Sequence, residues 1–491
     1  MNRLFIFIIT LFIANTFAEA QKSGYDIKVK IEGFEEKEMY LGYFYADKQY
    51  LRDTAQVDEA GWFRFQGEEA FDGGVYLIVM PPDNKFFQLI LDENEQQFTI
   101  ETKMPDMAGN LKLKNAPDNQ LLYDYLGFLS AKRPASEQLG KELKAAEGDE
   151  AASKKIRAKM EALNQEVTDF QKNLIAKHPK TITAAIVKAN MPLEEPKYEG
   201  ETPEEKQMNR WRWNDAHYFD NINLGDPRMM RTPFLFNKVN DYVDKMVIQH
   251  PDTIGKAIDR VLTLMKPADE TFKYYLIHFL NKYANAKIVG MDAVYVHIVE
   301  TYYETGQAPW TEEEQLAKIV DNARKLKPVL IGKTAPNIKM QTQDKQEFDL
   351  YSVDAPYTVM LVWDPDCGHC KKSMPAIKEF YEEFKDKGVE VFAICNKSWE
   401  RDDDGNINLD EVKKCWEYIE EKEIGQWVNV VDPFHRSRYK SLYFIQSTPK
   451  IFVLDKDKKI VSKGISGEQL SDVMSRIIEV DQKKWEEEGE E

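Results

Sequence analysis

Two cysteines separated by two residues are the part of this sequence best suited to chemistry. They stand in the stretch VWDPDCGHCKKSMP, residues 362–375, which places Gly368 and His369 between Cys367 and Cys370. A pair at this spacing can cycle between a dithiol and a disulfide, supply half of a metal site, or form a structural cross-link. Which of these applies depends on the elements that position the pair and on the other cysteines of the chain.

The apolar pattern around the pair predicts a strand followed directly by a helix. The strand is expected over 357–363 and the helix over 367–384. At the start of a helix a thiol meets unpaired backbone N–H groups and the positive end of the helix dipole, and both favour the thiolate. Cys367 is therefore the expected nucleophile. Cys370, one turn deeper, is expected to attack the mixed disulfide as the resolving thiol.

Charged neighbours act on this thiolate in opposite directions. When protonated, His369 places a positive charge beside the thiolate, which stabilises the reduced state and makes the disulfide more oxidising. Asp364 and Asp366 bring negative charge to the same loop and oppose that effect. The sequence leaves the sign of the net shift in the pKa of Cys367 open. Either aspartate could accept a proton, although a solvated loop acid is the favoured interpretation.

Positions outside the cysteine pair extend the pattern. Trp363 precedes the first cysteine by four places, Pro375 follows the second by five, and Thr448-Pro449 opens the segment KIFVLD. Together with the pair, these residues resemble the thioredoxin superfamily over about residues 330–480. The resemblance implies a thioredoxin-like α/β fold, no cofactor and no metal. It also implies that Trp363, Thr448 and a cis Pro449 bind substrate beside the disulfide.

Two features point to different branches of that superfamily. The dipeptide Gly368-His369 is that of protein disulfide isomerases. The stretch IGKTAPNIKM at 331–340 and the insert that holds a predicted helix over 409–419 more closely resemble TlpA-like periplasmic thiol-disulfide oxidoreductases. One departure is Leu361, where thioredoxins carry a buried acid for proton transfer, so this relay is absent or moved.

The resemblance implies an activity and a class of partner. We expect the CGHC pair to exchange its disulfide with cysteines of envelope proteins. A reductase would need electrons from a membrane donor, as is typical of TlpA-like proteins, whereas an oxidase or isomerase would fit the Gly-His dipeptide better. A reductase or isomerase is favoured because the surrounding domain is TlpA-like.

The other two cysteines leave alternatives open. Cys395 ends a strand predicted over 389–395, and Cys415 lies on the apolar face of the helix predicted over 409–419. Inert packing residues are the favoured interpretation, and a disulfide between the two is the alternative. A zinc site shared with the CGHC pair is not expected, because a second short-spaced pair is lacking.

The N-terminus predicts export. Residues 1–20 run from Arg3 through an apolar stretch to Ala18-Glu-Ala20, which is the pattern of a cleaved signal peptide. No later segment is long and apolar enough to span a membrane, so the mature protein is expected in the periplasm of a Gram-negative cell envelope. The formal net charge of −18 argues against nucleic-acid binding.

The remaining sequence predicts a multidomain chain. Period-two patterns predict an antiparallel β-sandwich over 21–110, and period-3.6 patterns predict an all-helical domain over 111–326. The thioredoxin-like domain follows over 330–480, with a closing helix from about Glu468 to Val480. An acidic tail, 481–491, is expected to be solvated and disordered.

The sequence of the helical domain shows no catalytic or metal-binding pattern. Two of its segments share the pattern His-Pro-x-Thr-Ile-x-x-Ala-Ile, and in each the threonine, Thr181 or Thr253, is expected to cap the next helix. The repeat suggests a duplicated helical hairpin. Thr311 and Glu314 are expected to form a capping box at the start of the last helix.

A binding protein is the competing class. In that hypothesis the two preceding domains recognise a ligand or an envelope partner, and the thioredoxin fold is a scaffold. The intact CxxC motif, Trp363 and Pro449 weigh against it, because a scaffold does not require a thiolate at a helix start.

Overall fold

The computed structural model describes residues 24–489, with side chains as far as Lys483. The predicted signal peptide, 1–20, therefore lies outside the described residues. None of the described helices is long and apolar enough to cross a membrane. The chain divides into two compact units: residues up to Met246 with Thr263–Thr271, and Val247–Leu262 with the residues from Phe272 onward.

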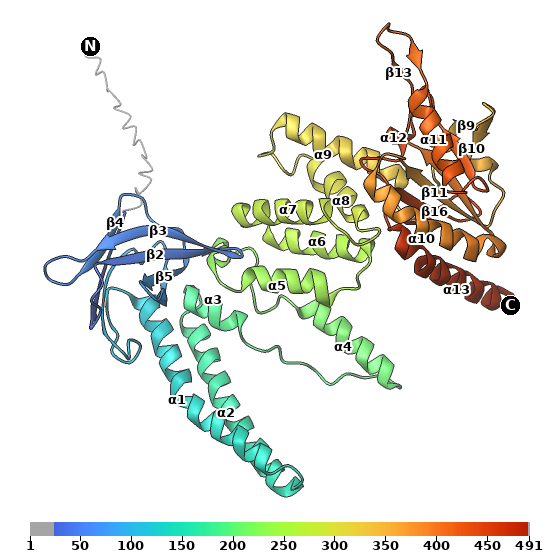
Figure 1. The fold of residues 1–491 in the computed structure, drawn as a ribbon. Helices are drawn as coiled ribbons and strands as arrows, with labels where there is room; N and C mark the ends of the chain where they lie inside the picture. The colour runs from blue at the N-terminus through green and yellow to red at the C-terminus, as the bar shows by residue number, and fades with distance from the viewer. Residues whose placement is uncertain (1–23, 490–491) are drawn as a thin grey trace, which may run out of the picture. The chain divides into compact units, whose positions relative to one another are not determined.

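Two four-stranded sheets form the β-region of the first unit (Figure 1). In one sheet the order of neighbouring strands is β4 (Phe63–Gly67), β1 (Tyr25–Glu32), β7 (Gln97–Lys103) and β8 (Lys112–Lys114). In the other it is β3 (Lys48–Gln56), β2 (Glu38–Tyr45), β5 (Gly74–Met80) and β6 (Lys85–Leu91). Alternate apolar side chains of both sheets share one core, which confirms the predicted β-rich domain.

The sandwich differs from the prediction in one pairing and one boundary. Strands β1 and β7 run parallel, with Ile27 opposite Phe98, so the expectation of purely antiparallel pairing is wrong there. A parallel pair needs a long connection, and the second sheet lies within the chain that joins these two strands. β8 also extends the sandwich past the predicted boundary at residue 110.

Helices fill the middle of the sequence, as predicted. The first unit contains α1 (Pro117–Ala145), α2 (Glu150–Lys177), α3 (Ile182–Ala189), α4 (Pro203–His217) and α5 (Leu235–Asp241). They are followed along the chain by α6 (Pro251–Met265), α7 (Asp269–Ala284), α8 (Asp292–Ile298) and α9 (Glu313–Leu326). The prediction of a capping box at Thr311 and Glu314 is wrong, because the N-cap residue of α9 is Glu312. The Thr311 N–H instead donates a hydrogen bond to the Ala308 carbonyl in the preceding turn.

The two copies of the repeated pattern do not fold alike. Thr181 caps α3, since its hydroxyl accepts a hydrogen bond from the Ala184 N–H, as predicted. In the second copy the helix α6 already begins at Pro251, so Thr253 lies inside the first turn and does not cap it. Proline suits the first helical position because its fixed φ matches the helix and its missing N–H would be unpaired there. The predicted duplicated hairpin is therefore not matched at the level of its helix starts.

A seven-stranded mixed sheet forms the centre of the C-terminal α/β region. Its strands are, in order, β10 (Glu347–Asp349), β9 (Lys339–Gln341), β15 (Val428–Val431), β12 (Val389–Cys395), β11 (Tyr357–Trp363), β16 (Lys450–Leu454) and β17 (Ile460–Lys463). β11 is parallel to β12 and antiparallel to β16, and all of its residues are buried. This arrangement confirms the predicted α/β fold.

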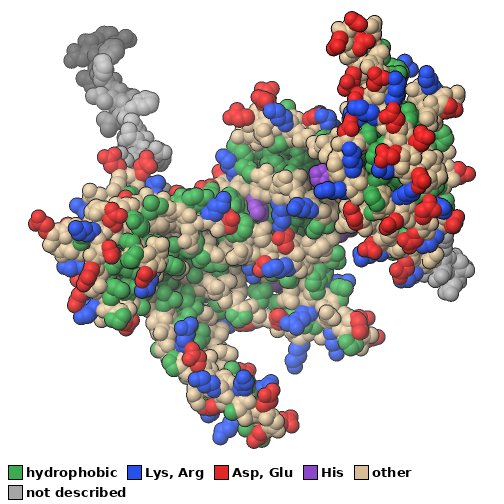
Figure 2. All heavy atoms as spheres, viewed as in Figure 1, with side chains coloured by type: hydrophobic (Ala, Val, Ile, Leu, Met, Phe, Trp, Pro, Cys, Tyr) green, Lys and Arg blue, Asp and Glu red, His purple; other side chains and the backbone are tan. Residues whose placement is uncertain are grey.

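Both faces of this sheet are covered. Side chains of α10 (Gly368–Phe384), α11 (Asp410–Glu421) and α13 (Leu470–Gly489) pack on the face that carries Leu361 and Trp363. The short helix α12 (Tyr439–Leu442) and the segment from Val329 to Met340 cover the other face. A small hairpin, β13 (Glu400–Arg401) and β14 (Ile407–Asn408), precedes α11. Figure 2 shows acidic and basic side chains interspersed over the visible surface of this region.

The closing helix is longer than predicted. α13 continues past Val480 to Gly489, so most of the segment 481–491 is helical rather than disordered. The Tyr357 hydroxyl donates a hydrogen bond to Asp481 at 2.7 Å, which ties this part of the helix to the start of β11. This acidic segment therefore continues a helix whose first turns pack on the core through Leu470 and Met474.

Candidate active site

Both cysteines of the CGHC motif lie at the junction of β11 and α10. Cys367 is the N-cap residue of α10, and its side chain is partly exposed. Cys370 lies in the first turn and is only 2% exposed. Both are free thiols in this structure. The junction places one accessible sulfur and one protected sulfur at the carboxyl end of a central strand.

Their surroundings move the two thiol pKa values apart. Hydrogen bonding from the Cys370 N–H is the main cause that lowers the pKa of Cys367, and contacts with Thr448 and the His369 N–H act in the same direction against a burial effect. Burial raises the pKa of Cys370 to about 11. The site therefore has a polarity: the outer thiol is stabilised as a thiolate and the inner thiol stays protonated. A nucleophile and a resolving thiol require this difference in pKa.

The loop before β16 faces the outer sulfur. The Thr448-Pro449 peptide bond is cis, in agreement with the family resemblance. The Cys367 thiol donates a hydrogen bond to the Thr448 carbonyl oxygen at 3.4 Å. The Cys367 sulfur therefore lies against the Thr448 carbonyl. That Thr448 and Pro449 bind the substrate backbone stays a prediction.

Trp363 ends β11 as predicted, but its side chain does not face the space beside the disulfide where a substrate would bind. Its side chain is fully buried, and its ring packs against Tyr418 of α11 with a centroid separation of 5.1 Å. Side chains at the end of a central strand that point into a covered face are enclosed by the helices on that face. The expectation that Trp363 contacts substrate is corrected, because the residue instead supports the site from beneath.

A lysine that the sequence analysis did not consider compensates the acidic loop. Lys397 Nζ lies 2.7 Å from Asp366 Oδ2 and 3.5 Å from Asp364 Oδ1. It also lies 2.9 Å from Glu411 Oε2, at the start of α11. The hydrogen bond from Lys397 is the main cause that lowers the pKa of Asp366, so this carboxylate remains ionised and paired. The negative charge of the loop therefore does not reverse the shift of the Cys367 pKa.

His369 contributes differently from the sequence expectation. Its side chain is exposed to solvent, and the contact that lowers the pKa of Cys367 comes from its backbone N–H. Backbone donors at a helix start act at every pH, whereas an imidazole acts only when it is protonated. The proposed effect of the His369 charge on the thiolate stays a prediction.

The other two cysteines form a disulfide. Cys395 ends β12 directly beside Trp363 in the strand register, and Cys415 lies on the buried face of α11. A disulfide joins them, with a Cα–Cα distance of 6.1 Å. The favoured interpretation of unpaired packing residues is therefore wrong. Both sulfurs are committed to each other, so neither is available for a zinc site with the CGHC pair.

The thiol pKa values predict a pH profile for alkylation. Reduced protein is expected to react with iodoacetamide at Cys367 alone, in one step whose midpoint lies below the roughly 8.5 of an unperturbed cysteine. A lowered pKa means more thiolate at any pH below that midpoint, so the rate at neutral pH should exceed that of a peptide of residues 362–375 in denaturant. Mass spectrometry assigns the modified cysteine. Equal modification of Cys370 in the same pH range would contradict this polarity.

Lys397 offers a test of the electrostatic balance. Lys397→Met keeps the aliphatic packing and leaves Asp364 and Asp366 without their cation, so the alkylation profile of Cys367 should move to higher pH. Lys387→Met, in the turn that follows the far end of α10, removes a lysine that pairs with Glu383 and should leave the profile unchanged. Coincident profiles for the Lys397 variant and the unmodified protein would show that the loop acids do not act on the thiolate.

Each of the three regions of the chain matches a known protein family. Residues 331–463 match the AhpC/TSA family, and residues 150–326 and 25–122 match two families described as domains of unknown function, DUF5106 and DUF4369. The chain is 26% identical over 149 residues to a thiol-disulfide oxidoreductase ResA of Bacillus cereus, and the match covers 30% of this chain and 77% of ResA. It is 25% identical over 151 residues to ResA of Bacillus anthracis, with 30% and 76% coverage.

Two solved structures resemble parts of the chain. One is a domain of a "possible thiol-disulfide isomerase" from Cytophaga hutchinsonii, with 33% identity, a TM-score of 0.28, and coverage of 32% of this chain and 98% of that one. The other is a thioredoxin-like protein from Bacteroides caccae, with 20% identity, a TM-score of 0.44, and coverage of 58% and 98%. The match of residues 331–463 to the AhpC/TSA family and their homology to the ResA thiol-disulfide oxidoreductases identify a thioredoxin-like domain and support an oxidoreductase.

Proposed function

We propose that the chain is an exported thiol-disulfide oxidoreductase that exchanges its CGHC dithiol or disulfide with cysteines of partner proteins. The observation that carries this proposal is the polarity of the site, with an accessible Cys367 of lowered pKa above a buried Cys370 of raised pKa. A binding scaffold has no need for this difference. The CGHC pair is therefore the reacting group.

The reaction follows from that polarity. The Cys367 thiolate attacks one sulfur of a substrate disulfide, the substrate S–S bond breaks, and one substrate thiolate leaves and takes up a proton. Cys370 then loses its proton and attacks Cys367 in the mixed disulfide, which releases the second substrate thiol. Two electrons pass to the substrate, and the Cys367–Cys370 disulfide is formed. The reverse sequence oxidises a substrate dithiol.

Two observations support the proposed compartment and direction. The disulfide between Cys395 and Cys415 is stable in an oxidising compartment, which agrees with export to the periplasm through the predicted signal peptide. A lowered pKa of Cys367 stabilises the reduced state and makes the disulfide more oxidising, which suits an isomerase. A reductase would need a membrane electron donor to pass electrons to substrates against this tendency. Cysteine-containing envelope proteins are the proposed partners.

Two assays of the mature protein, residues 21–491, separate these activities. A reductase should accelerate reduction of a protein disulfide by a slow chemical reductant. An isomerase should restore activity to ribonuclease with scrambled disulfides, without net oxidation. Lack of activity in both assays, with the CGHC thiols shown to be intact by mass spectrometry, would reject the proposed function.

A further inference from the structure

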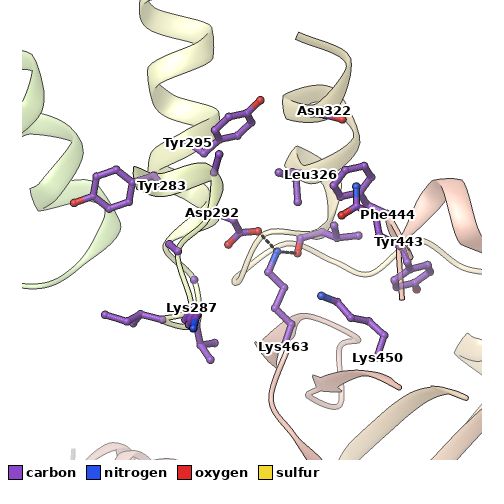
Figure 3. Close-up of a pocket in the computed structure, with 18 of the residues that line it drawn as sticks. Tyr283, Lys287, Asp292, Tyr295, Asn322, Leu326, Tyr443, Phe444, Lys450 and Lys463 are labelled. Atoms are coloured by element: carbon purple, nitrogen blue, oxygen red, sulfur yellow. Dashed lines mark hydrogen bonds and ion pairs between the residues drawn. The ribbon is translucent and has the colours of Figure 1, made fainter. Parts of the chain in front are cut away.

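A pocket in the second unit lies beside the loop that faces Cys367. Its volume is 510 Å³. Gln446, Ser447 and Lys450 line one wall, and they flank the Thr448-Pro449 peptide. The opposite wall comes from the helical region, including Asp292 and Tyr295 of α8 and residues of α7 and α9 (Figure 3). One wall of the pocket therefore belongs to the loop that faces Cys367, and the other belongs to the helical region, to which no chemistry is assigned.

The pocket carries more positive charge than its one acid compensates. Lys287, Lys450 and Lys463 line it, and Asp292 is the one acidic residue among the described residues of its lining. Lys463 is 8% exposed and donates hydrogen bonds to the Asp292 carboxylate and, at 2.6 Å, to the Val329 carbonyl. Lys463 therefore already uses the only carboxylate in that lining.

Two lysines remain without an anionic partner. Neither Lys287 nor Lys450 forms an ion pair with a carboxylate in the described part of the chain. Figure 3 shows Lys450 beside Lys463 at the base of the pocket. Burial is the main cause that lowers the pKa of Lys463, and repulsion from Lys450 lowers it further. A bound anion would relieve this repulsion, because it would face both ammonium groups.

The remaining walls suit a segment of polypeptide better than a bare ion. Tyr283, Tyr295, Leu326 and Phe444 supply apolar surface, and Gln446 and Ser447 supply polar groups along the open edge. Thr448 contacts the Cys367 sulfur, and its neighbour in the chain, Ser447, lines the pocket. Chain residues on that side of the reacting cysteine would enter the pocket.

We propose that this pocket binds a carboxylate side chain of the substrate polypeptide, carried within a few residues of the reacting cysteine on an extended chain. The inference rests on the proposed function and adds to it the class of substrate. Acidic segments are selected although the whole chain has a formal charge of −18, because the local charge of the pocket is positive.

Short synthetic peptides test this selection. Each peptide has one cysteine in a disulfide with 2-mercaptoethanol, blocked termini, and either Glu or Gln at a set spacing. With reduced full-length protein, the Glu peptide at the best spacing should react about three- to tenfold faster than its Gln counterpart. High salt should reduce this ratio because it screens the charges. The ratio should fall to about one in the Lys287→Gln/Lys450→Gln variant.

Controls separate the pocket from the reaction itself. Lys459→Gln removes an exposed lysine of the same domain that does not line the pocket, so it should keep the preference for Glu. The rate with the Gln peptide should be the same in all three proteins. An equal rate for Glu and Gln peptides in the unmodified protein, or a preference that survives in the double variant, would overturn the pocket assignment. Failure of both peptides to react would reject the proposed function, and the pocket assignment with it.

Discussion

Cys367→Ser is expected to slow disulfide exchange by more than about a thousandfold, because it removes the attacking thiolate. Cys370→Ser should also stop turnover, but at a later step. Without the resolving thiol, the mixed disulfide between Cys367 and the substrate cannot be released. It should therefore accumulate and appear as a covalent complex in mass spectra recorded without reductant.

The pair of variants also tests the order of attack. The double variant Cys367→Ser/Cys370→Ser should form no complex, and it serves as the control for nonspecific trapping. Complex formation by Cys367→Ser and not by Cys370→Ser would assign the first attack to the buried thiol and contradict the pKa difference. If Cys367→Ser abolished exchange and left the protein's function in the cell unchanged, the chain would be a binding protein that uses this fold as a scaffold.

Removal of the Cys395–Cys415 disulfide should lower the free energy of unfolding of the second unit by about 3 kcal/mol in Cys395→Ala/Cys415→Ala. The two cysteines are 20 positions apart in the sequence, and a loop of this length restricts the unfolded chain considerably. Both side chains are buried, so loss of packing acts in the same direction. Denaturant unfolding followed by tryptophan fluorescence measures the change.

Reductant provides the matched control for that experiment. In a Cys367→Ser/Cys370→Ser background the only remaining thiols are those of the buried disulfide, so reduction should bring the stability close to that of the alanine variant. The alanine variant itself should not respond to reductant. Equal stability of the oxidised and reduced forms would show that the two cysteines contribute through packing alone, as the sequence analysis favoured.

Local patterns were sufficient to predict the elements around the CGHC pair. The stretch 357–363, apolar except for Thr358, predicts a strand buried on both faces, and the amphipathic stretch after Cys367 predicts the helix that covers it. The position of Cys367 at the helix start follows from those two elements alone. This is why the nucleophile and the resolving thiol could be inferred without knowledge of any contact between distant residues.

The contacts that complete the site depend on strand order, which local patterns do not specify. Lys397 reaches Asp366 because β12 lies beside β11, so the ends of both strands meet at one edge of the sheet. The same register places Cys395 beside Trp363, where α11 brings Cys415 onto it. An inspection of the residues that follow neighbouring parallel strands would have found Lys397.

Two segments lack the apolar period from which an element is predicted. Strand β3 is largely exposed and rich in charged residues, so it gives no alternating pattern, although it pairs along its length with β2. The end of α13 was predicted as a disordered tail from its acidic composition, whereas helix continuation is favoured by the strong helix propensity of glutamate. In both cases tertiary pairing or intrinsic propensity decided the structure.

The reduction potential of the Cys367–Cys370 couple tests the central claim most directly. Thiol trapping across glutathione buffers, followed by mass spectrometry of the peptide that carries both cysteines, separates this couple from the Cys395–Cys415 disulfide. A two-electron transition is predicted at a potential between about −270 mV, typical of thioredoxin, and about −180 mV, typical of disulfide isomerases, because the lowered pKa of Cys367 stabilises the reduced form. A pair that remains fully reduced, or fully oxidised, at every glutathione ratio would contradict the assignment of this site as a thiol-disulfide exchange centre.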